Sequence, residues 1–142
     1  MGAGAGPDDF DARALQPRTV IERDFLMRQI AQFVQILAAV VAGKGRGEHA
    51  EAQQALVTGL EEVSGLRLGE VHRMSRAEIE ALVTEDGLRL PEKAVALADL
   101  LREDAEVAGR VRARWLYEFA IDAGGPVPFD VHERIAALPE AE

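Results

Sequence analysis

An apolar stripe between residues 19 and 43 constrains the fold of this chain more than any other feature of its sequence. Large apolar residues recur there at alternating spacings of four and three, as Leu26, Ile30, Phe33, Leu37 and Val40. This repeat places all of them on one face of an α-helix. We therefore expect a long amphipathic helix whose apolar face is the surface on which the other segments pack.

Local signals predict where this helix begins and ends. Thr19, followed by Glu22 three residues later, is the pattern of a capping box, in which each side chain hydrogen-bonds the other residue's backbone N–H. Gly43 can adopt the positive φ that commonly ends a helix. The predicted helix of about 23 residues is about 34 Å long. Residues 1–17, rich in Gly, Ala and Asp, are expected to form a flexible lead-in to a single helical domain over residues 18–142.

The last turns of this predicted helix are apolar on nearly all sides, with Ile36, Val40 and Val41 among their residues. Either other helices of the chain cover this end, or a second copy of the chain packs on it. These three residues are therefore candidates for self-association, with a homodimer as the expected form. Arg28 and several glutamines interrupt the roughly 18 apolar residues that a membrane span requires, so no membrane partner is expected.

Further helical segments are expected along the rest of the chain. Their ranges are 48–64, 75–84, 91 to a point between 104 and 109, 108–122 and 130–138. Gly65 ends the first of them, and Pro91 occupies the first turn of the third. A capping box of Ser75 and Glu78 begins the second. Because no run of alternating β-branched residues indicates a strand, the sequence predicts an all-α fold of five or six helices, with antiparallel hairpins packed on the long first helix.

Charge and cysteine content exclude several classes of partner. The chain has 16 basic and 25 acidic residues, a net charge of −9, which repels the phosphate backbone of nucleic acids. It contains no cysteine, so disulfides and thiolate zinc sites are ruled out. No secretory signal pattern is found near Met1. We expect a cytoplasmic protein that binds no nucleic acid.

The residues that most often carry catalysis or hold cofactors show no suitable spacing. His49, His72 and His132 are never three or four residues apart, the separation that directs two helical ligands toward one metal ion. The Gly-rich segment 43–47 follows a helix and lacks a Ser or Thr after Lys44, so it does not match a phosphate-binding loop. Paired acidic residues at 61–62, 85–86 and 103–104 fall on predicted polar faces or helix ends, where water surrounds them. We predict no catalytic residue, no metal and no cofactor.

A basic and aromatic cluster in segment 108–122 is the strongest candidate for a binding site. The cluster consists of Arg110, Arg112, Arg114, Trp115 and Tyr117. Arginine makes bidentate contacts with carboxylates and phosphates, and aromatic rings stack on ligands, so the cluster is a candidate site for an anionic ligand or an acidic peptide. The alternative is structural: acidic residues stand four positions from Arg110 and from Arg114, the spacing of ion pairs within a helix.

The segment 23–33, Arg-Asp-Phe-Leu-Met-Arg-Gln-Ile-Ala-Gln-Phe, resembles the opening of a family of uncharacterised bacterial helical proteins, a domain of unknown function whose members begin Asp-(Tyr/Phe)-Leu-Met-Arg-x-Ile-x-Gln. The similarity extends to about residue 120, and the chain departs from the family after Ala123. The resemblance implies an all-helical, tetratricopeptide-like fold with no assigned activity, so no catalytic residue is transferred. Segments 91–104 and 108–122 also alternate small and large residues as one tetratricopeptide-type repeat does.

Two classes of function remain open on these grounds. The first is a non-enzymatic helical module that binds itself or another protein, through the apolar end of the first helix or the groove of the hairpin formed by segments 91–104 and 108–122. The second is a protein or enzyme with a pocket between its helices for a small molecule or an anion, which the arginines of the cluster would hold. We expect the first class, because the end of the first helix carries excess apolar surface and the sequence shows no group of catalytic residues at a suitable spacing.

Overall fold

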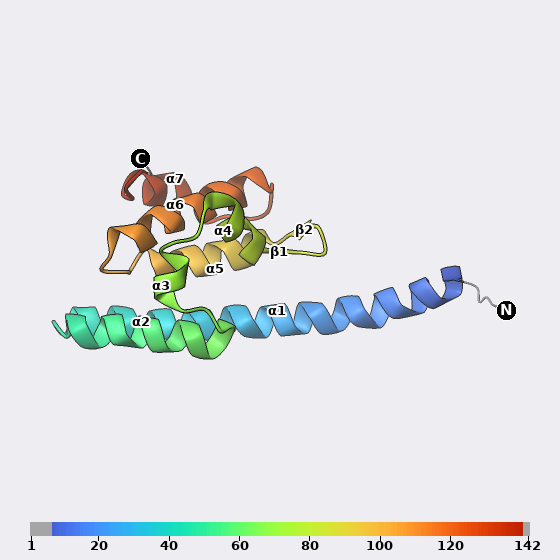
Figure 1. The fold of residues 1–142 in the computed structure, drawn as a ribbon, viewed down its shortest axis with the longest axis horizontal. Coiled ribbons are helices and arrows are strands. Elements are labelled where there is room, and N and C mark those ends of the chain that lie inside the picture. The colour runs from blue at the N-terminus through green and yellow to red at the C-terminus, as the bar shows by residue number, and fades with distance from the viewer. Residues whose placement is uncertain (1–6, 141–142) are drawn as a thin grey trace.

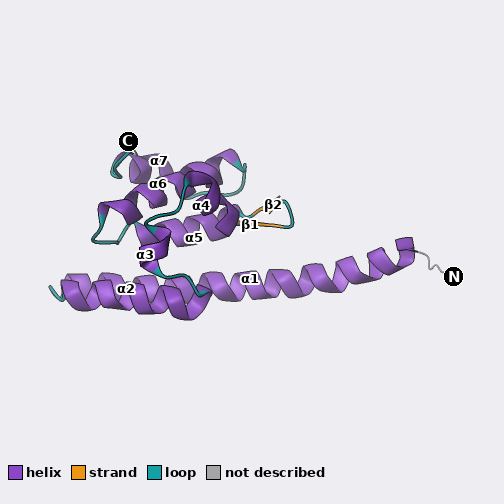
Figure 2. Ribbon diagram, in the orientation of Figure 1, coloured by secondary structure: helices purple, strands orange, loops and turns teal. Residues whose placement is uncertain are grey.

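The computed structural model describes residues 7–140, and their side chains from residue 23 onward. Within that range the chain forms seven α-helices and one small antiparallel hairpin (Figure 1, Figure 2). The elements are α1 (Pro7–Gly45), α2 (His49–Ser64), α3 (Leu68–Val71), α4 (Arg76–Leu82), β1 (Thr84–Glu85), β2 (Leu88–Arg89), α5 (Pro91–Leu101), α6 (Val107–Asp122) and α7 (Val131–Ala136). The expectation of a mostly helical protein is confirmed.

Helix α1 is longer than the sequence indicated. It begins at Pro7, so Thr19 lies inside the helix and does not cap it, and residues 7–17 of the expected lead-in are helical. Residues 1–6 lie outside the described part. Its 39 residues correspond to about 58 Å, and the N-terminal half extends away from the rest of the molecule (Figure 1).

Helices α1 and α2 form an antiparallel hairpin that makes one layer of the molecule (Figure 1). Gly43 lies against Ala52 near the turn, and Ile36 lies against Gly59 further along, so the two helices run in opposite directions. A Cβ atom at Gly59 would be 2.8 Å from Ile36 Cγ1, which is closer than side chains approach one another. Gly65 ends α2 with φ 74° and donates its N–H to the Glu61 carbonyl at 2.8 Å, as predicted.

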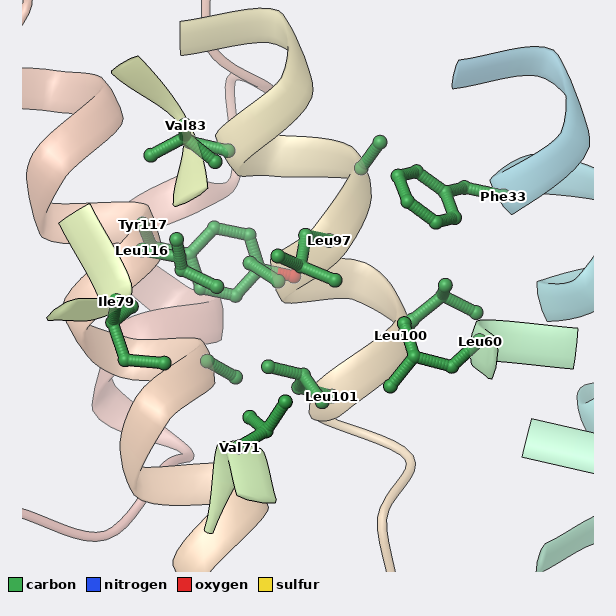
Figure 3. Packing of buried hydrophobic residues seen from close by; sticks show 14 of the residues in the cluster. Phe33, Leu60, Val71, Ile79, Val83, Leu97, Leu100, Leu101, Leu116 and Tyr117 are labelled. Atoms are coloured by element: carbon green, nitrogen blue, oxygen red, sulfur yellow. The ribbon is translucent and has the colours of Figure 1, made fainter. Parts of the chain in front are cut away.

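The second layer contains α3 to α7, and α5 lies between the α1–α2 hairpin and the pair of α4 and α6 (Figure 1). On one side of α5, Leu97 and Leu100 point toward Phe33 of α1 and Leu60 of α2 (Figure 3). On the other side the core continues through Tyr117 of α6. The hydrophobic core therefore runs through α5, and the stripe of α1 forms only one of its walls.

Two short elements show how local signals act. Ser75 caps α4 by accepting the Glu78 N–H at 3.1 Å, and its own N–H donates to Glu78 Oε1 at 2.8 Å, which confirms the predicted capping box. The β1–β2 hairpin was not predicted. Asp86 and Gly87 form its turn with φ of 52° and 77°, and two successive positive φ values are typical of the tight turn that joins paired strands.

Candidate functional site

The basic and aromatic cluster of α6 bonds mainly to the protein itself. Arg110 Nη1 donates to the carbonyls of Asp104 and Ala105, both at 2.9 Å, and so fixes the connection between α5 and α6. Arg114 Nη1 donates to the carbonyls of Ile135 and Leu138, at 3.1 and 3.0 Å, and so holds α7 on α6. The Ile135 carbonyl also accepts the Leu138 N–H at 3.0 Å, so Arg114 adds a further bond at the end of α7. Arg110 and Arg114 therefore stabilise the fold by bonding to backbone carbonyls, a role that the sequence pattern did not reveal.

Tyr117, which the sequence placed in the same cluster, is a core residue. Its side chain is fully buried, and its hydroxyl donates to the Asp99 carboxylate of α5. Arg134 Nη1 of α7 donates to the same carboxylate oxygen at 2.7 Å. Burial, reinforced by the hydrogen bond to Asp99 and its negative charge, raises the pKa of Tyr117 well above its ordinary value. Tyr117 thus joins α5, α6 and α7 and presents no ring to a ligand.

Trp115 lies half-buried on another face of α6, beneath Arg112. The Arg112 guanidinium stands 4.8 Å from the centre of the Trp115 ring and donates to the Met74 carbonyl at 2.8 Å. Burial lowers the pKa of Arg112. This arginine connects the start of α4 to α6.

One open depression of about 350 Å³ lies beside these side chains. It is lined by Arg76, Arg114, Trp115, Glu118 and Glu140. The Glu118 carboxylate stands between the two arginines, with Arg76 Nη1 at 3.0 Å and Arg114 Nε at 3.2 Å. An incoming anion would have to displace Glu118 from both, so this depression offers little to an anionic ligand.

A buried polar cluster, not predicted from the sequence, joins α2, α3 and the α5–α6 connection. The Asp104 carboxylate is buried, with His72 Nε2 at 2.6 Å from Oδ2 and Gln53 Nε2 donating to Oδ1 at 2.9 Å. The Glu106 N–H donates to the same Oδ1 at 3.0 Å. Gly109 is required beside it, because a Cβ there would overlap the Asp104 carboxylate. The polar atoms of Asp104 are satisfied inside the protein, which is typical of a structural role.

The three predicted self-association residues do not form one surface. Val40 is fully buried in the monomer, and Ile36 is half-buried against α2. Only Val41, with half of its surface exposed, is available to a partner. The assignment of Val40 to self-association is therefore corrected, because α2 and α5 cover that side of α1.

A different apolar stripe of α1 is exposed. It repeats the alternating spacings of four and three and consists of Met27, Ala31, Val34, Ala38 and Val41, which we call the outer stripe. The exposed fractions are 43% for Met27, 55% for Val34 and 50% for Val41. This is the spacing of the contact positions of a coiled coil, and it spans about 21 Å of helix. Each residue of the outer stripe directly follows a residue of the apolar stripe that the sequence analysis described, so the repeat was visible in the sequence.

The segment Arg23–Gly45 of α1 is also long and apolar enough to cross a membrane, with a mean hydropathy of 1.6 over its most apolar part. That result concerns length and composition only. Helix α2 lies alongside this segment and exposes Glu51, Glu61 and Glu62. A bilayer around α1 would have to accommodate these carboxylates, and charged groups in a bilayer interior are costly.

Comparison with known proteins found no matching family model, curated protein or solved structure. The resemblance of segment 23–33 to a family of bacterial helical proteins therefore stays a prediction.

Proposed function

We propose that this chain is a non-enzymatic helical module that self-associates through the outer stripe of α1. The observation that carries the proposal is the exposure of a coiled-coil repeat on a helix whose opposite side is already packed. Single exposed apolar residues are common on soluble proteins, but a continuous apolar row is typical of an interaction surface. A second copy of the chain is the occupant that fits this row best.

The arrangement of the outer stripe favours an antiparallel pair. If two copies cross at Val34, Met27 of each meets Val41 of the other, and Ala31 meets Ala38. The stripe is thus complementary to itself under a two-fold axis, as a closed dimer requires. The alanines let the two helix backbones approach closely.

Charge supports the same orientation. Asp24 continues the outer stripe three residues before Met27 and is exposed. In a parallel pair Asp24 would face Asp24 of the second copy, and like charges in contact repel. In the antiparallel pair it lies near the basic segment 44–46 of the second copy.

The size of this contact sets the expected strength. A stripe of about 21 Å on one helix buries less surface than the roughly 1,000 Å² that marks stable interfaces. We therefore expect a reversible, concentration-dependent dimer.

Sedimentation equilibrium of the full chain tests the proposal. The wild-type chain is expected to pass from monomer to dimer with rising concentration. Val34→Asp places two carboxylates together at the two-fold axis and is expected to abolish the dimer while circular dichroism stays helical. Gln32→Asp adds the same charge to an exposed position of α1 off the outer stripe, and this control variant is expected to dimerise nearly as the wild type does.

Three results would overturn the proposal. They are a wild-type chain that stays monomeric at high concentration, an equal effect of Val34→Asp and Gln32→Asp, and binding of monomers to neutral lipid vesicles through α1. The last result would assign the outer stripe to a membrane instead of to a second copy.

Narrower predictions accompany this function. We propose that the α5–α6 hairpin packs as a tetratricopeptide-type repeat, which is supported by the alternation of small Ala94 and Ala98 with large Leu97 and Leu101. The cysteine-free composition supports a cytoplasmic location, and the net charge of −9 supports the absence of a nucleic-acid partner.

A further inference from the structure

A small cavity of about 90 Å³ lies where α1 meets the end of α2, α4 and the first turns of α5. Phe33, Leu82 and Leu97 form apolar walls. Gln29 from α1 and Lys93 from α5 are polar groups in its lining. The cavity is separate from the outer stripe and from the arginine cluster of α6.

Gln29 is the less expected of these two residues. It is only 8% exposed, yet its side-chain amide makes no hydrogen bond to any residue that the structure describes. Its amide atoms still reach water, because Arg112 Nε and Arg134 Nε are the fully buried side-chain atoms without a hydrogen-bond partner among the described residues. The Gln29 amide is therefore free to bond to water or to a ligand that enters the cavity.

Lys93 adds a charge to the same cavity. Its side chain is 12% exposed, and its ammonium group lies 3.7 Å from Glu85 Oε2 of the β1–β2 hairpin. Glu85 is itself half-exposed, and a separation of 3.7 Å is longer than a hydrogen bond. The ammonium group therefore retains the capacity to donate to a nearer acceptor.

We propose that this cavity binds a short monocarboxylate, whose carboxylate accepts hydrogen bonds from Lys93 Nζ and from the Gln29 amide. Its hydrocarbon end lies against Phe33, Leu82 and Leu97. A volume of about 90 Å³ corresponds to about three water molecules, which suits an acid of roughly three to five heavy atoms. The carboxylate of the acid takes the place of the half-exposed Glu85 carboxylate beside the one ammonium group, whereas a doubly charged phosphate would add a charge that no group in the cavity balances.

The test uses the full chain labelled with ¹³C at the lysine Cε atoms, because Lys44 and Lys93 are its only lysines. Propionate is added across millimolar concentrations, and propionamide is the neutral control. The Lys93 signal is expected to shift to a plateau with propionate and to stay fixed with propionamide. The Lys44 signal, whose ammonium group is bonded to Glu103, is expected to stay fixed with both.

A matched pair of variants assigns the second contact. Gln29→Met keeps the length of the side chain and removes its donor, and it is expected to weaken propionate binding about tenfold. Gln32→Met makes the same change at an exposed position of α1 and is expected to leave binding unchanged. An unchanged Lys44 spectrum verifies that both variants fold.

Four results would overturn this inference: no shift of the Lys93 signal with propionate, equal linear shifts of both lysines, an equal response to propionamide, and equal binding by Gln29→Met and the wild type. The first would mean that the cavity holds water only. Because the site lies away from the outer stripe, none of these results bears on self-association.

Discussion

Helices α1 and α5 are both rich in apolar residues, but the chain covers them to very different extents. Along the 11 residues of α5, the residues Ala94, Ala96, Leu97, Ala98, Leu100 and Leu101 are all buried. Along α1, from residue 23 on, the buried apolar side chains are Leu26, Phe33 and Val40, and most other positions are exposed. Apolar content therefore identifies a helix that must pack, whereas the number of its neighbours decides how much of it remains for a partner.

The largest expected effect tests α5 as the centre of the core. Leu100→Ala is expected to lower the free energy of unfolding by about 2–5 kcal/mol, because it leaves a cavity between α5 and α2. Val41→Ala on the outer stripe is expected to change it by less than about 0.5 kcal/mol in the monomer. Urea unfolding at low protein concentration measures both. Equal losses would mean that α1 is covered as fully as α5.

The next effect concerns the packed side of α1. Gly59→Ala is expected to destabilise the chain by about 1–2 kcal/mol, since the new methyl group overlaps Ile36 and the gain in helix propensity offsets only part of that cost. Gly45→Ala meets no atom within 4 Å and serves as the control, with a neutral or slightly stabilising effect. In urea titrations, combining Gly59→Ala with Ile36→Ala should cost less than the two single losses added together. Additive losses would contradict the close contact.

Alkaline pH tests the far side of α5, where Tyr117 bonds to Asp99. The pKa of Tyr117 is raised in the folded chain, so its contribution to stability is complete below its ordinary pKa of 10.0 and is lost as the pH rises through the higher folded value. Between these two pKa values the free energy of unfolding should fall by up to about 1.4 kcal/mol per pH unit. Urea midpoints across this range measure the effect. Tyr117→Phe should remove this dependence, and an unchanged slope would show that other groups cause it.

The smallest expected effect concerns a local signal far from α1. Ser75→Ala removes the side chain that caps α4 and should lower the free energy of unfolding by about 1 kcal/mol. Circular dichroism during thermal unfolding follows the loss. Because α4 packs mainly on α6 and contributes no residue to the outer stripe, the dimer should persist in this variant. A loss of both stability and dimerisation would mean that the two layers are coupled.

The sequence predicted the helices well where interactions between residues close in the sequence determine their ends. The predicted segment 108–122 became α6 at Val107–Asp122, and the predicted segment 48–64 became α2 at His49–Ser64. Pro91 and Gly65 mark the first turn of α5 and the end of α2, because each restricts or permits only certain φ values. The start of α1 could not be read, since the capping pattern at Thr19 also occurs inside helices. The hairpin at Asp86 and Gly87 was not predicted, because the sequence indicated only that segment 75–84 ends before it.

The candidate sites were less predictable. The arginines of α6 were correctly located on a helix, but their bonds to carbonyls were not predicted. Arg110 bonds to Asp104 six residues away in the preceding connection, and Arg114 bonds to Ile135, which is 21 residues away. Asp104 was interpreted as a solvated carboxylate, although the structure buries it beside His72 and Gln53. Gly109, in the first turn of α6 where Ala would be favoured, was a signal that a side chain packs closely there.

The sequence alone determined that this chain forms helices, where most of them end, and that α1 carries more apolar surface than one face needs. Those properties depend on residues within a turn or two of each other. Only the tertiary structure decided that α5 occupies the centre, that Val40 is covered and that Val41 is not. The reason is that burial depends on contacts between segments far apart in the chain, which no local pattern encodes.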